Sequence, residues 1–515
     1  MNFKQVSFAI LMVFLIVTLI GCNSKTSSDD PDSELKISLN AQPESLDPQI
    51  SSTVVSEFVT RNIFETLVAL NAEFEPVPML AESIDESEDG KTYTFKLREG
   101  VKFHNGEEMT SSDVVASMNR WLEVANPAKL LGEANFEAKD EFTVVLNLED
   151  RMAKALHIMA SNIQNAAIMP EEIVQNSGSD VITEYIGTGP YAFEEWKQDQ
   201  YIKLVKFDDY QNLDSESSGL SGNKKASIQE ITYLITTDSS TRVAGVETGE
   251  YDIAIQIPSD EYERLKGTEN VETHTHPGSS ILIIYNKKEG IASDPEMRRA
   301  INTAFDMDEI MKASFVEDLY ELHPGYMSPD NATWNSTAGE EFYNQANLDK
   351  AKTMLDELDY DGETVKLMTS REYIFHYNTA VVVKEQLEKL GMNVELEIYD
   401  WATLLDRRND PALWDIHIQS NTYFPTPLQL LPLSPDYAGW TDDPKITELM
   451  NEIGLEKDAQ NSKELWNELQ EFLWEEYLPL SLAGHSNGII ATSHHVESME
   501  LFHGGINPWN VTLTK

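Results

Sequence analysis

Residues of types that bind small molecules follow three expected strands in the second half of the chain. They are Arg371, Tyr373, Trp401, Asn421, Thr422, Tyr423 and Phe424. In open α/β sheets, ligands bind beyond the carboxyl ends of the strands, because loops there are free to vary and helix N-termini point at the crevice. Aromatic rings mixed with short hydrogen-bonding side chains suit a molecule that is partly apolar and partly polar. We therefore expect a small-molecule site at this edge.

Several of these residues also have a structural interpretation. Tyr373 and Trp401 suit packing in a core or between lobes, because most aromatic residues in any domain are structural. Arg371 has a planar guanidinium that suits a ligand carboxylate, and it is equally placed to pair with Glu372 or with solvent. The segment SNTYFPTP, residues 420–427, is poor core material because it combines two prolines with polar residues.

Three strands and one helix must position these side chains. TVKLMTS (364–370) and NVELEIYDW (393–401) are expected strands, and the amphipathic segment 378–391 between them is an expected helix that Gly391 ends. Such a βαβ unit places its two strands parallel. LWDIHIQSN (413–421) supplies a further strand. The second half is therefore expected to form an α/β lobe.

The first half has a more antiparallel character. Apolar and polar residues alternate over 93–97, a return strand is expected from Val101, and Asn-Gly at 105–106 suits a tight turn. Thr110 with Asp113 three residues later predicts a capping box at the start of a helix.

Composition excludes several classes of function. The chain has 88 acidic and 38 basic residues among 515, a net charge of -50, which argues against nucleic acid and anionic lipid surfaces as partners. With 41% hydrophobic residues it has enough apolar material for more than one core. Cys22 is the sole cysteine, so no disulfide, thiolate metal site or cysteine nucleophile is expected beyond it.

The N-terminus has the pattern of an export signal. Lys4 precedes an apolar run over 8–20 that is too short to span a bilayer comfortably. Residues 19–22, Leu-Ile-Gly-Cys, resemble the lipobox of bacterial lipoproteins, which implies cleavage before Cys22 and lipid on its sulfur. The alternatives are a plain secretory signal or a short membrane anchor with an incidental thiol.

Several motifs together resemble one family, the extracellular solute-binding proteins of the dipeptide, oligopeptide and nickel type, which are receptors of ABC importers. The motifs stand in the family's order along nearly the whole chain. They are NIFETLVAL at 62, the segment 89–121, GTGPYAFEEW at 187, TRVAGVETGEYDIA at 241, MRRAINTAFDMDEI at 297, LDKAKTML at 348 and EYLPLSLAGHS at 475.

The resemblance implies an α/β, two-lobed periplasmic-binding-protein-like fold of the large peptide-binding type. It implies crossings between the lobes near 253–257 and 480–487, and packing of the C-terminal GGINPWN against residues near Leu35. The implied organisation is a lipoprotein signal peptide at 1–21, a lipidated flexible tether at 22–34, a first lobe at 35–255 with an inserted subdomain at about 61–185, a second lobe at 256–482 and a return to the first lobe at 483–515.

The implied role is capture of a small, peptide-like solute by lobe closure and its delivery to an ABC permease and its ATPase. The protein would be a monomer without a cofactor, anchored outside the cell membrane through Cys22 alone. No phosphate-binding glycine loop is present. A receptor of the same family for nickel, a metal chelate, an opine or a sugar is the alternative.

One departure from the family's pattern affects the ligand. Peptide receptors usually carry an aspartate in the 420–427 loop that holds the peptide's α-ammonium, and alignment on Pro427 places Tyr423 near that position and Thr426 at a second aspartate. A buried ammonium without a carboxylate loses a contact of about 1–3 kcal/mol. Either the ligand is not held here by a free α-amine, or a carboxylate elsewhere substitutes, with Glu372 and Asp400 as candidates.

Two other functions compete with solute capture. Imidazole pairs suit nickel, copper or zinc, but no third ligand stands at convincing spacing, so no direct metal site is expected. The histidines concerned are His274, His276, His485, His494, His495 and His503. An enzyme is not expected either, because the chain lacks a Gly-x-Ser-x-Gly elbow and a His-Glu-x-x-His motif.

Overall fold

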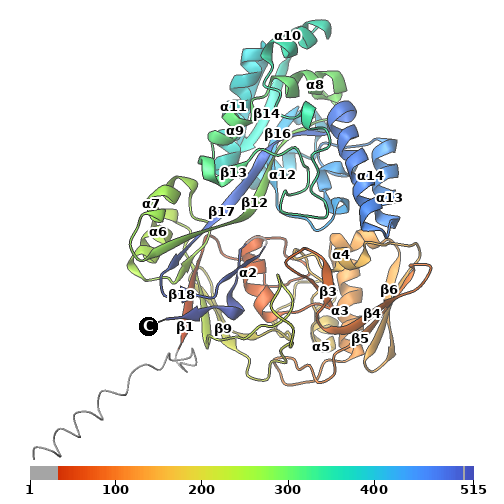
Figure 1. Ribbon diagram of the computed structural model, residues 1–515, viewed down its shortest axis with the longest axis vertical. Coiled ribbons are helices and arrows are strands. Elements are labelled where there is room, and N and C mark those ends of the chain that lie inside the picture. The colour runs from red at the N-terminus through yellow and green to blue at the C-terminus, as the bar shows by residue number, and fades with distance from the viewer. Residues whose placement is uncertain (1–32, 503–504, 515) are drawn as a thin grey trace, which may run out of the picture.

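The computed structural model describes residues 33–502 and 505–514, which form two bodies joined by long strands (Figure 1). The predicted signal peptide, Cys22, most of the predicted tether and His503 lie outside the described residues. None of the helices within these ranges has the length and apolar character needed to cross a membrane.

One large sheet runs through both bodies. Its strands are β1 (Glu34–Leu39), β8 (Tyr191–Lys197), β9 (Tyr201–Lys206), β10 (Glu230–Ile235), β11 (Ile253–Ala254), β12 (Val271–Tyr285), β13 (Tyr320–Glu321), β14 (Thr364–Ser370), β15 (Asn393–Tyr399), β16 (Ile416–Asn421) and β17 (Leu480–Ser493). They follow the order β15-β14-β16-β12-β17-β11-β1-β10-β9-β8, with β13 also paired to β17.

The lower body in Figure 1, here the first lobe, contains β1, β8 to β11 and a separate antiparallel sheet of order β4-β5-β7-β6. The strands of this second sheet are β4 (Ala81–Glu86), β5 (Thr92–Leu97), β6 (Ala134–Asp140) and β7 (Thr143–Leu148). The remaining elements are β2 (Val68–Leu70), β3 (Pro76–Pro78), α2 (Val54–Ile63), α3 (Ser111–Val124), α4 (Ala155–Met159), α5 (Glu171–Ser177), α6 (Ser239–Thr248) and α7 (Tyr262–Lys266).

The upper body, here the second lobe, places helices around β14, β15 and β16 (Figure 1). The helices are α8 (Pro295–Ala304), α9 (Met307–Lys312), α10 (Leu348–Glu357), α11 (Ile374–Leu390), α12 (Trp401–Arg407), α13 (Pro444–Leu455) and α14 (Ala459–Phe472). Its core is a single buried cluster that includes Ile283, Leu367, Val383 and Trp414.

The predicted βαβ unit is confirmed. β14 and β15 are parallel in register from Thr364 opposite Asn393 to Ser370 opposite Tyr399, and α11 connects them. The helix begins at Ile374, four residues before the predicted start, because the aromatic residues of its first turn pack against one another and on the second-lobe core. β15 ends at Tyr399, two residues before the predicted end, and β16 begins at Ile416, three residues after the predicted start.

The antiparallel character of the first half is also confirmed, with one correction. β5 is the expected alternating strand, and the backbone N–H of Thr110 donates to the Asp113 carboxylate at 2.9 Å, as a capping box requires. The prediction of a return strand from Val101 is wrong. Only Lys102 bridges to Glu108, because the turn at 105–106 follows too soon for a longer ladder.

β12 and β17 form the connection between the lobes, which we call the strand crossing. They pair antiparallel from Val271 opposite Ser493 to Ile284 opposite Leu480. The first of these ends lies beside β11 in the first lobe, and the second lies beside β16 in the second lobe. The sequence reasoning named the β17 part of this crossing. It placed the other crossing at 253–257, but β11 lies there within the first lobe between β1 and β17, and β12 is the strand that crosses.

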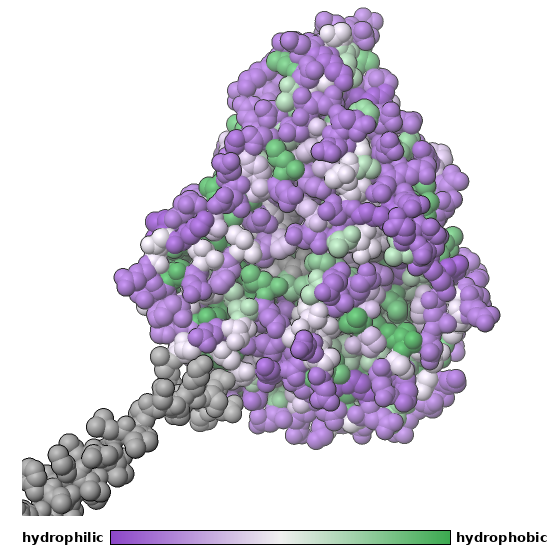
Figure 2. Space-filling model, viewed as in Figure 1, coloured by the Kyte–Doolittle hydropathy of each residue, from purple (hydrophilic) through white to green (hydrophobic). Residues whose placement is uncertain are grey.

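The C-terminal segment lies in the first lobe, as predicted. Ile506 and Trp509 share one buried cluster with Leu35 of β1. Short strands tie this segment together, namely β18 (Val496–Glu497) with β21 (Thr512–Leu513) and β19 (Glu500–Phe502) with β20 (Gly505–Asn507). Hydrophilic residues cover most of the face seen in Figure 2, and hydrophobic residues lie there in separate patches.

Candidate functional site between the lobes

A cavity lies where the strand crossing meets the loop after β16. Its wall consists of the β12 segment 277–280, the segment 326–330, the loop 421–424 and the β17 segment 485–487, together with Glu321 and Leu430. The cavity has a volume of about 30 Å³, room for only a few atoms in this conformation. A solute of ordinary size therefore needs the lobes to move apart before it enters.

Glycine at position 278 allows β12 and β17 to approach closely at this cavity. The ladder is irregular between Pro277 and Ser280, and a Cβ atom on Gly278 would lie 2.7 Å from the backbone carbonyl oxygen of Ser486. The irregularity turns polar groups of the crossing toward the site, as bulges commonly do.

Tyr423 reaches from the second lobe into the first. Its ring stacks on Phe74 of the β2–β3 hairpin with centroids 4.3 Å apart, and it belongs to a buried cluster of first-lobe residues. Asn331 Nδ2 donates to its hydroxyl at 2.7 Å. Burial raises the pKa of Tyr423, and the charges of Glu75 and Asp330 act in the same direction. The tyrosine therefore contacts the opposite lobe while it lines the cavity.

The charged groups at the cavity are acidic. Glu321 and Asp330 belong to its wall, and neither forms an ion pair with a residue of the described chain. His485 is neutral at physiological pH because burial lowers its pKa to about 3. Its ring nitrogens bond to the Ser280 hydroxyl and the Gly325 carbonyl oxygen, each at 3.0 Å.

Four of the seven predicted binding residues, Asn421, Thr422, Tyr423 and Phe424, line this cavity. The other three lie outside its wall. Tyr373 packs edge-on against Trp401 with centroids 4.9 Å apart, and the guanidinium of Arg371 lies 4.7 Å above the Tyr377 ring. Tyr373 and Trp401 therefore belong to a separate aromatic cluster at the start of α11 and α12, and Arg371 lies beside Tyr377 of α11.

The aromatic cluster remains connected to the cavity edge. His376 packs against both Tyr373 and Trp401, and its Nε2 lies 3.0 Å from the Ser420 hydroxyl, next to Asn421 in β16. The cluster thus lies at the same carboxyl edge of the sheet, as the strand-end rule predicts.

The two carboxylates considered as replacements for the family's aspartate lie elsewhere. Asp400 caps α12 by accepting from the Thr403 backbone N–H at 3.0 Å, and its pKa is lowered by bonds from the hydroxyl and N–H of Thr403. Glu372 accepts from the backbone N–H of Trp401 at 3.3 Å. Both act at the start of one helix.

Comparisons with known proteins identify the family. The model of the bacterial extracellular solute-binding proteins, family 5, matches residues 75–462, more than half of the chain. The chain belongs to this family. The resemblance seen in the motifs is thereby confirmed.

Relatives and solved structures agree with this assignment. The oligopeptide-binding protein AppA of Bacillus subtilis is 27% identical over 445 residues, covering 79% of this chain and 78% of AppA. A probable peptide ABC transporter periplasmic-binding protein, y4tO of Sinorhizobium fredii, is 25% identical and covers 84% and 85%. NikA from Brucella suis in complex with Fe(III)-EDTA superposes with a TM-score of 0.80 at 21% identity, over 94% of this chain and all of NikA.

A further solved structure is AgaA in complex with agropinic acid, from A. tumefaciens R10. It superposes with a TM-score of 0.79 at 23% identity, covering 94% of this chain and 99% of AgaA. Structural matches at this identity show the fold alone. They confirm the two-lobed α/β architecture predicted from the sequence.

The histidines of this family-5 protein mostly serve structural contacts. His274 bonds to the Thr492 hydroxyl at 2.9 Å, His276 bonds to the Pro277 carbonyl oxygen at 2.9 Å, and the rings of His494 and His495 lie 3.9 Å apart. Within the described part of the chain, no group of three or more His, Cys, Asp or Glu side chains is arranged to hold a metal ion.

Sequence reasoning missed most of the cavity wall. Segments 277–280 and 326–330 and residue Glu321 are far from the loop 421–424 in sequence, and the sheet brings them together. A signal was present in PGSS at 277–280, since glycine beside proline inside a strand suggests a bulge or a close approach of backbones.

Proposed function

We propose that this family-5 protein is the solute receptor of an ABC importer and that it captures a peptide-like solute between its lobes. The observation that carries the proposal is the cavity at the lobe boundary, walled by the strand crossing and by the predicted loop 421–424. A site shared by two bodies couples binding to their relative position. Arg371, Tyr373 and Trp401 join this site when the lobes separate and close on a larger solute.

The capture step needs no chemistry on the solute. A ligand shifts the equilibrium between open and closed lobes only by the difference between its affinities for the two states. Tyr423 contributes to that difference, because its contact with Phe74 forms only when the lobes are together. Tyr423 therefore favours the closed arrangement of the lobes when a solute binds.

The receptor works beside a permease and an ATPase at the outer face of the cell membrane, and lipid on Cys22 tethers it there. The support is the lipobox-like sequence at 19–22 and the relative named for a peptide ABC transporter. The protein would act as a monomer, and its second lobe would begin within β12 rather than at the predicted residue 256. Cys22→Ser expressed in bacteria should move the protein from the membrane fraction to the soluble fraction, and labelling with a radioactive fatty acid should be lost.

The test of solute capture is a thermal-shift screen with dipeptides and tripeptides, followed by calorimetry. A solute at a hundredfold excess over Kd stabilises the folded state by about 2.7 kcal/mol. Binding of a peptide that causes compaction in X-ray scattering supports the proposal. Binding without any compaction, or no binding by any member of the panel, contradicts it.

A second candidate is a receptor for an opine or a metal chelate. The favouring observation is that Tyr423 and Thr426 occupy the loop positions where peptide receptors usually carry aspartate, so no carboxylate of this loop holds an α-ammonium. Adding agropinic acid and a nickel–EDTA chelate to the same screen distinguishes the two candidates.

A further inference from the structure

A second cavity lies within the first lobe, beneath α2. It has a volume of about 40 Å³, room for about three water molecules or a few heavy atoms. Apolar side chains such as Phe64, Met79 and Leu220 form part of its wall. The solute-binding role assigned above does not use this cavity.

Buried ion pairs form the polar part of the same wall. Arg61 pairs with Glu57 one turn away on α2, and Lys224 Nζ lies 3.0 Å from Glu65 Oε1. These four side chains are each 1–6% exposed. Charges are rarely buried so completely unless they are paired, and the two pairs leave the cavity wall without net charge.

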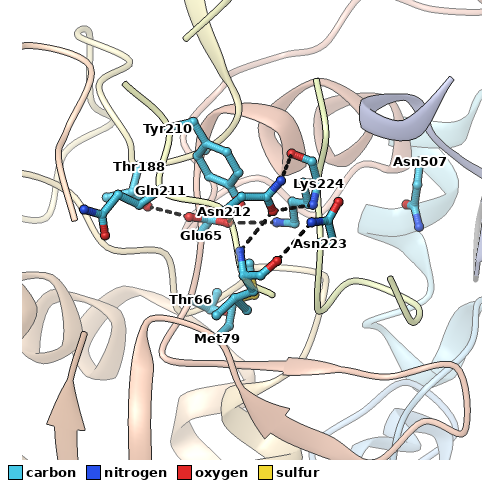
Figure 3. A network of polar contacts seen from close by, with 12 residues as sticks. Glu65, Thr66, Met79, Thr188, Tyr210, Gln211, Asn212, Asn223, Lys224 and Asn507 are labelled. Atoms are coloured by element: carbon cyan, nitrogen blue, oxygen red, sulfur yellow. Dashed lines mark hydrogen bonds and ion pairs between the residues drawn. The ribbon is translucent and has the colours of Figure 1, made fainter. Parts of the chain in front are cut away.

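The pair of Lys224 and Glu65 is fully engaged in a network. In Figure 3, Glu65 lies between Lys224, Tyr210 and Thr188. Tyr210 donates to Glu65 Oε1 at 2.8 Å, and Thr188 donates to Oε2 at 3.1 Å. Both carboxylate oxygens therefore have partners, and this side of the wall serves as a rigid support.

The same wall also contains polar atoms without hydrogen-bond partners in the described chain. They are the donors Arg61 Nε and Trp509 Nε1 and the acceptor Asn165 Oδ1. Arg61 is 5% exposed and Trp509 is 1% exposed. A buried polar group without a partner costs about 1–3 kcal/mol. A bound group that forms hydrogen bonds with these atoms would remove this cost.

We propose that this cavity is a binding subsite for an uncharged amide group. An amide supplies a carbonyl oxygen for the free donors of Arg61 and Trp509 and an N–H for Asn165. A charged group would be left uncompensated among two ion pairs that already neutralise each other. The subsite therefore selects a neutral group that carries both a donor and an acceptor.

The location of the subsite relates it to solute capture. Ala69 of β2 belongs to the cavity wall, and Phe74 at the turn of the same β2–β3 hairpin stacks on Tyr423, which lines the cavity between the lobes. The assignment of the amide to a peptide-like solute deepens the proposed function and rests on it. The affinity of the cavity for an amide is testable without knowing that solute.

The test uses N-methylacetamide as the probe and the indole N–H signals of the nine tryptophans as the readout. Trp509→Phe identifies the signal of Trp509. Trp196 in β8 is a matched internal control, because its Nε1 also lacks a partner while the residue lies outside the cavity wall. We expect N-methylacetamide to move the Trp509 signal saturably and to leave the Trp196 signal in place.

Acetate and methylammonium at the same concentration should leave the Trp509 signal unmoved. Asn165→Leu keeps both ion pairs and should weaken N-methylacetamide binding about fivefold, the value of one hydrogen bond. Ala160→Leu should fill the cavity and abolish the shift, and the Trp196 signal reports whether that variant is folded.

A Trp509 signal that does not move, or that moves equally with acetate, overturns the proposal. Equal affinities of the wild type and Asn165→Leu overturn the role of Asn165 and the choice of an amide. A solute screen without a ligand contradicts the proposed function and leaves this result unaffected, so the two failures are distinguishable.

Discussion

The two sides of the lobe boundary are built differently. On one side, the strand crossing joins the lobes through backbone pairing of β12 with β17 over nearly the whole length of both strands. On the other side, α4 lies under α13 and α14 (Figure 1), and no strand pairs across this part of the boundary in the described chain. We call this second region the lateral contact.

The lateral contact contains few bonds. The backbone N–H of Ala153 donates to the Gly454 carbonyl oxygen at 2.8 Å, Lys154 Nζ donates to the Ser462 hydroxyl at 3.0 Å, and Lys457 pairs with Glu86. Hydrogen bonds of this kind are worth about 1 kcal/mol each, and exposed ion pairs are worth less. The difference indicates that the crossing is the stronger joint, and we expect the lateral contact to be the part that opens.

The largest expected effect comes from the core of the crossing. Ile283 in β12 is 0% exposed, and Ile283→Ala should lower the free energy of unfolding by about 2–5 kcal/mol because it leaves a cavity. Urea unfolding measures this. Leu455→Ala at the end of α13, where the side chain is 45% exposed, is the control and should change stability by less than about 0.5 kcal/mol. Similar losses for both variants would remove the distinction between the two sides.

A smaller effect is expected at the close approach of the two crossing strands. Gly278→Ala places a Cβ atom 2.7 Å from the Ser486 carbonyl oxygen and should cost about 1–3 kcal/mol. It should also weaken solute binding, because the cavity wall at 277–280 must shift. Gly267→Ala, whose Cβ would meet nothing closer than 3.7 Å, is the control for thermal melting and calorimetry. A wild-type melting temperature in Gly278→Ala would show that the strands are not tightly apposed.

Tyr423 tests a contact that exists only when the lobes are together. Tyr423→Ala removes the stack on Phe74 and should weaken solute affinity about tenfold, while Tyr423→Phe keeps the stack and loses only the bond from Asn331, about 1 kcal/mol. Isothermal titration compares the three proteins. Equal affinities for wild type and Tyr423→Ala would contradict the role of this contact in closure.

Lys154 gives the smallest effect and a pH dependence. Burial lowers its pKa in the closed form, while Glu75, Glu456 and Asp458 oppose the shift. An open form that exposes Lys154 binds the proton more strongly, so closure should strengthen as pH rises from the lowered pKa toward about 10.4, the ordinary value for lysine. X-ray scattering of the solute-free protein at increasing pH measures the closure.

Lys154→Met is the variant that isolates this effect. It should abolish the pH dependence and leave closure intact, because an apolar side chain of similar size replaces a buried charge. Lys445→Met is the control. Lys445 lies on α13 and forms an exposed ion pair with Glu468 of α14, so this variant should keep the wild-type pH profile. A pH dependence that persists in Lys154→Met would contradict the assignment.

The sequence predicts local units of this fold well. Alternation at 93–97 and the period of the segment 364–399 are local signals, and β5, β14, α11 and β15 formed as expected. The length of β12 was not predictable in this way, because THTHPGSS contains a proline and a glycine that weaken any strand pattern. Pairing with β17 on one side and β16 on the other holds this segment extended.

The candidate site was predictable only where its residues follow from a local signal. Asn421, Thr422, Tyr423 and Phe424 follow directly from the end of one strand, so the strand-end rule located them at the cavity. Tyr373 and Trp401 obey the same rule and nevertheless lie in the neighbouring aromatic cluster, because the first turns of α11 and α12 pack their rings together, and Arg371 lies over the Tyr377 ring. No local pattern indicates that Tyr423 crosses to Phe74, since that contact depends on how two lobes meet.

The most direct test of two lobes that open at the lateral contact is a pair of distance measurements in a Cys22→Ser background. Spin labels at positions 86 and 457 report on the lateral contact, and labels at 272 and 494 report on the first-lobe end of the strand crossing. We predict that a bound solute narrows and shortens the 86–457 distance distribution and leaves the 272–494 distribution unchanged. An 86–457 distribution that stays the same with every bound solute would contradict the account.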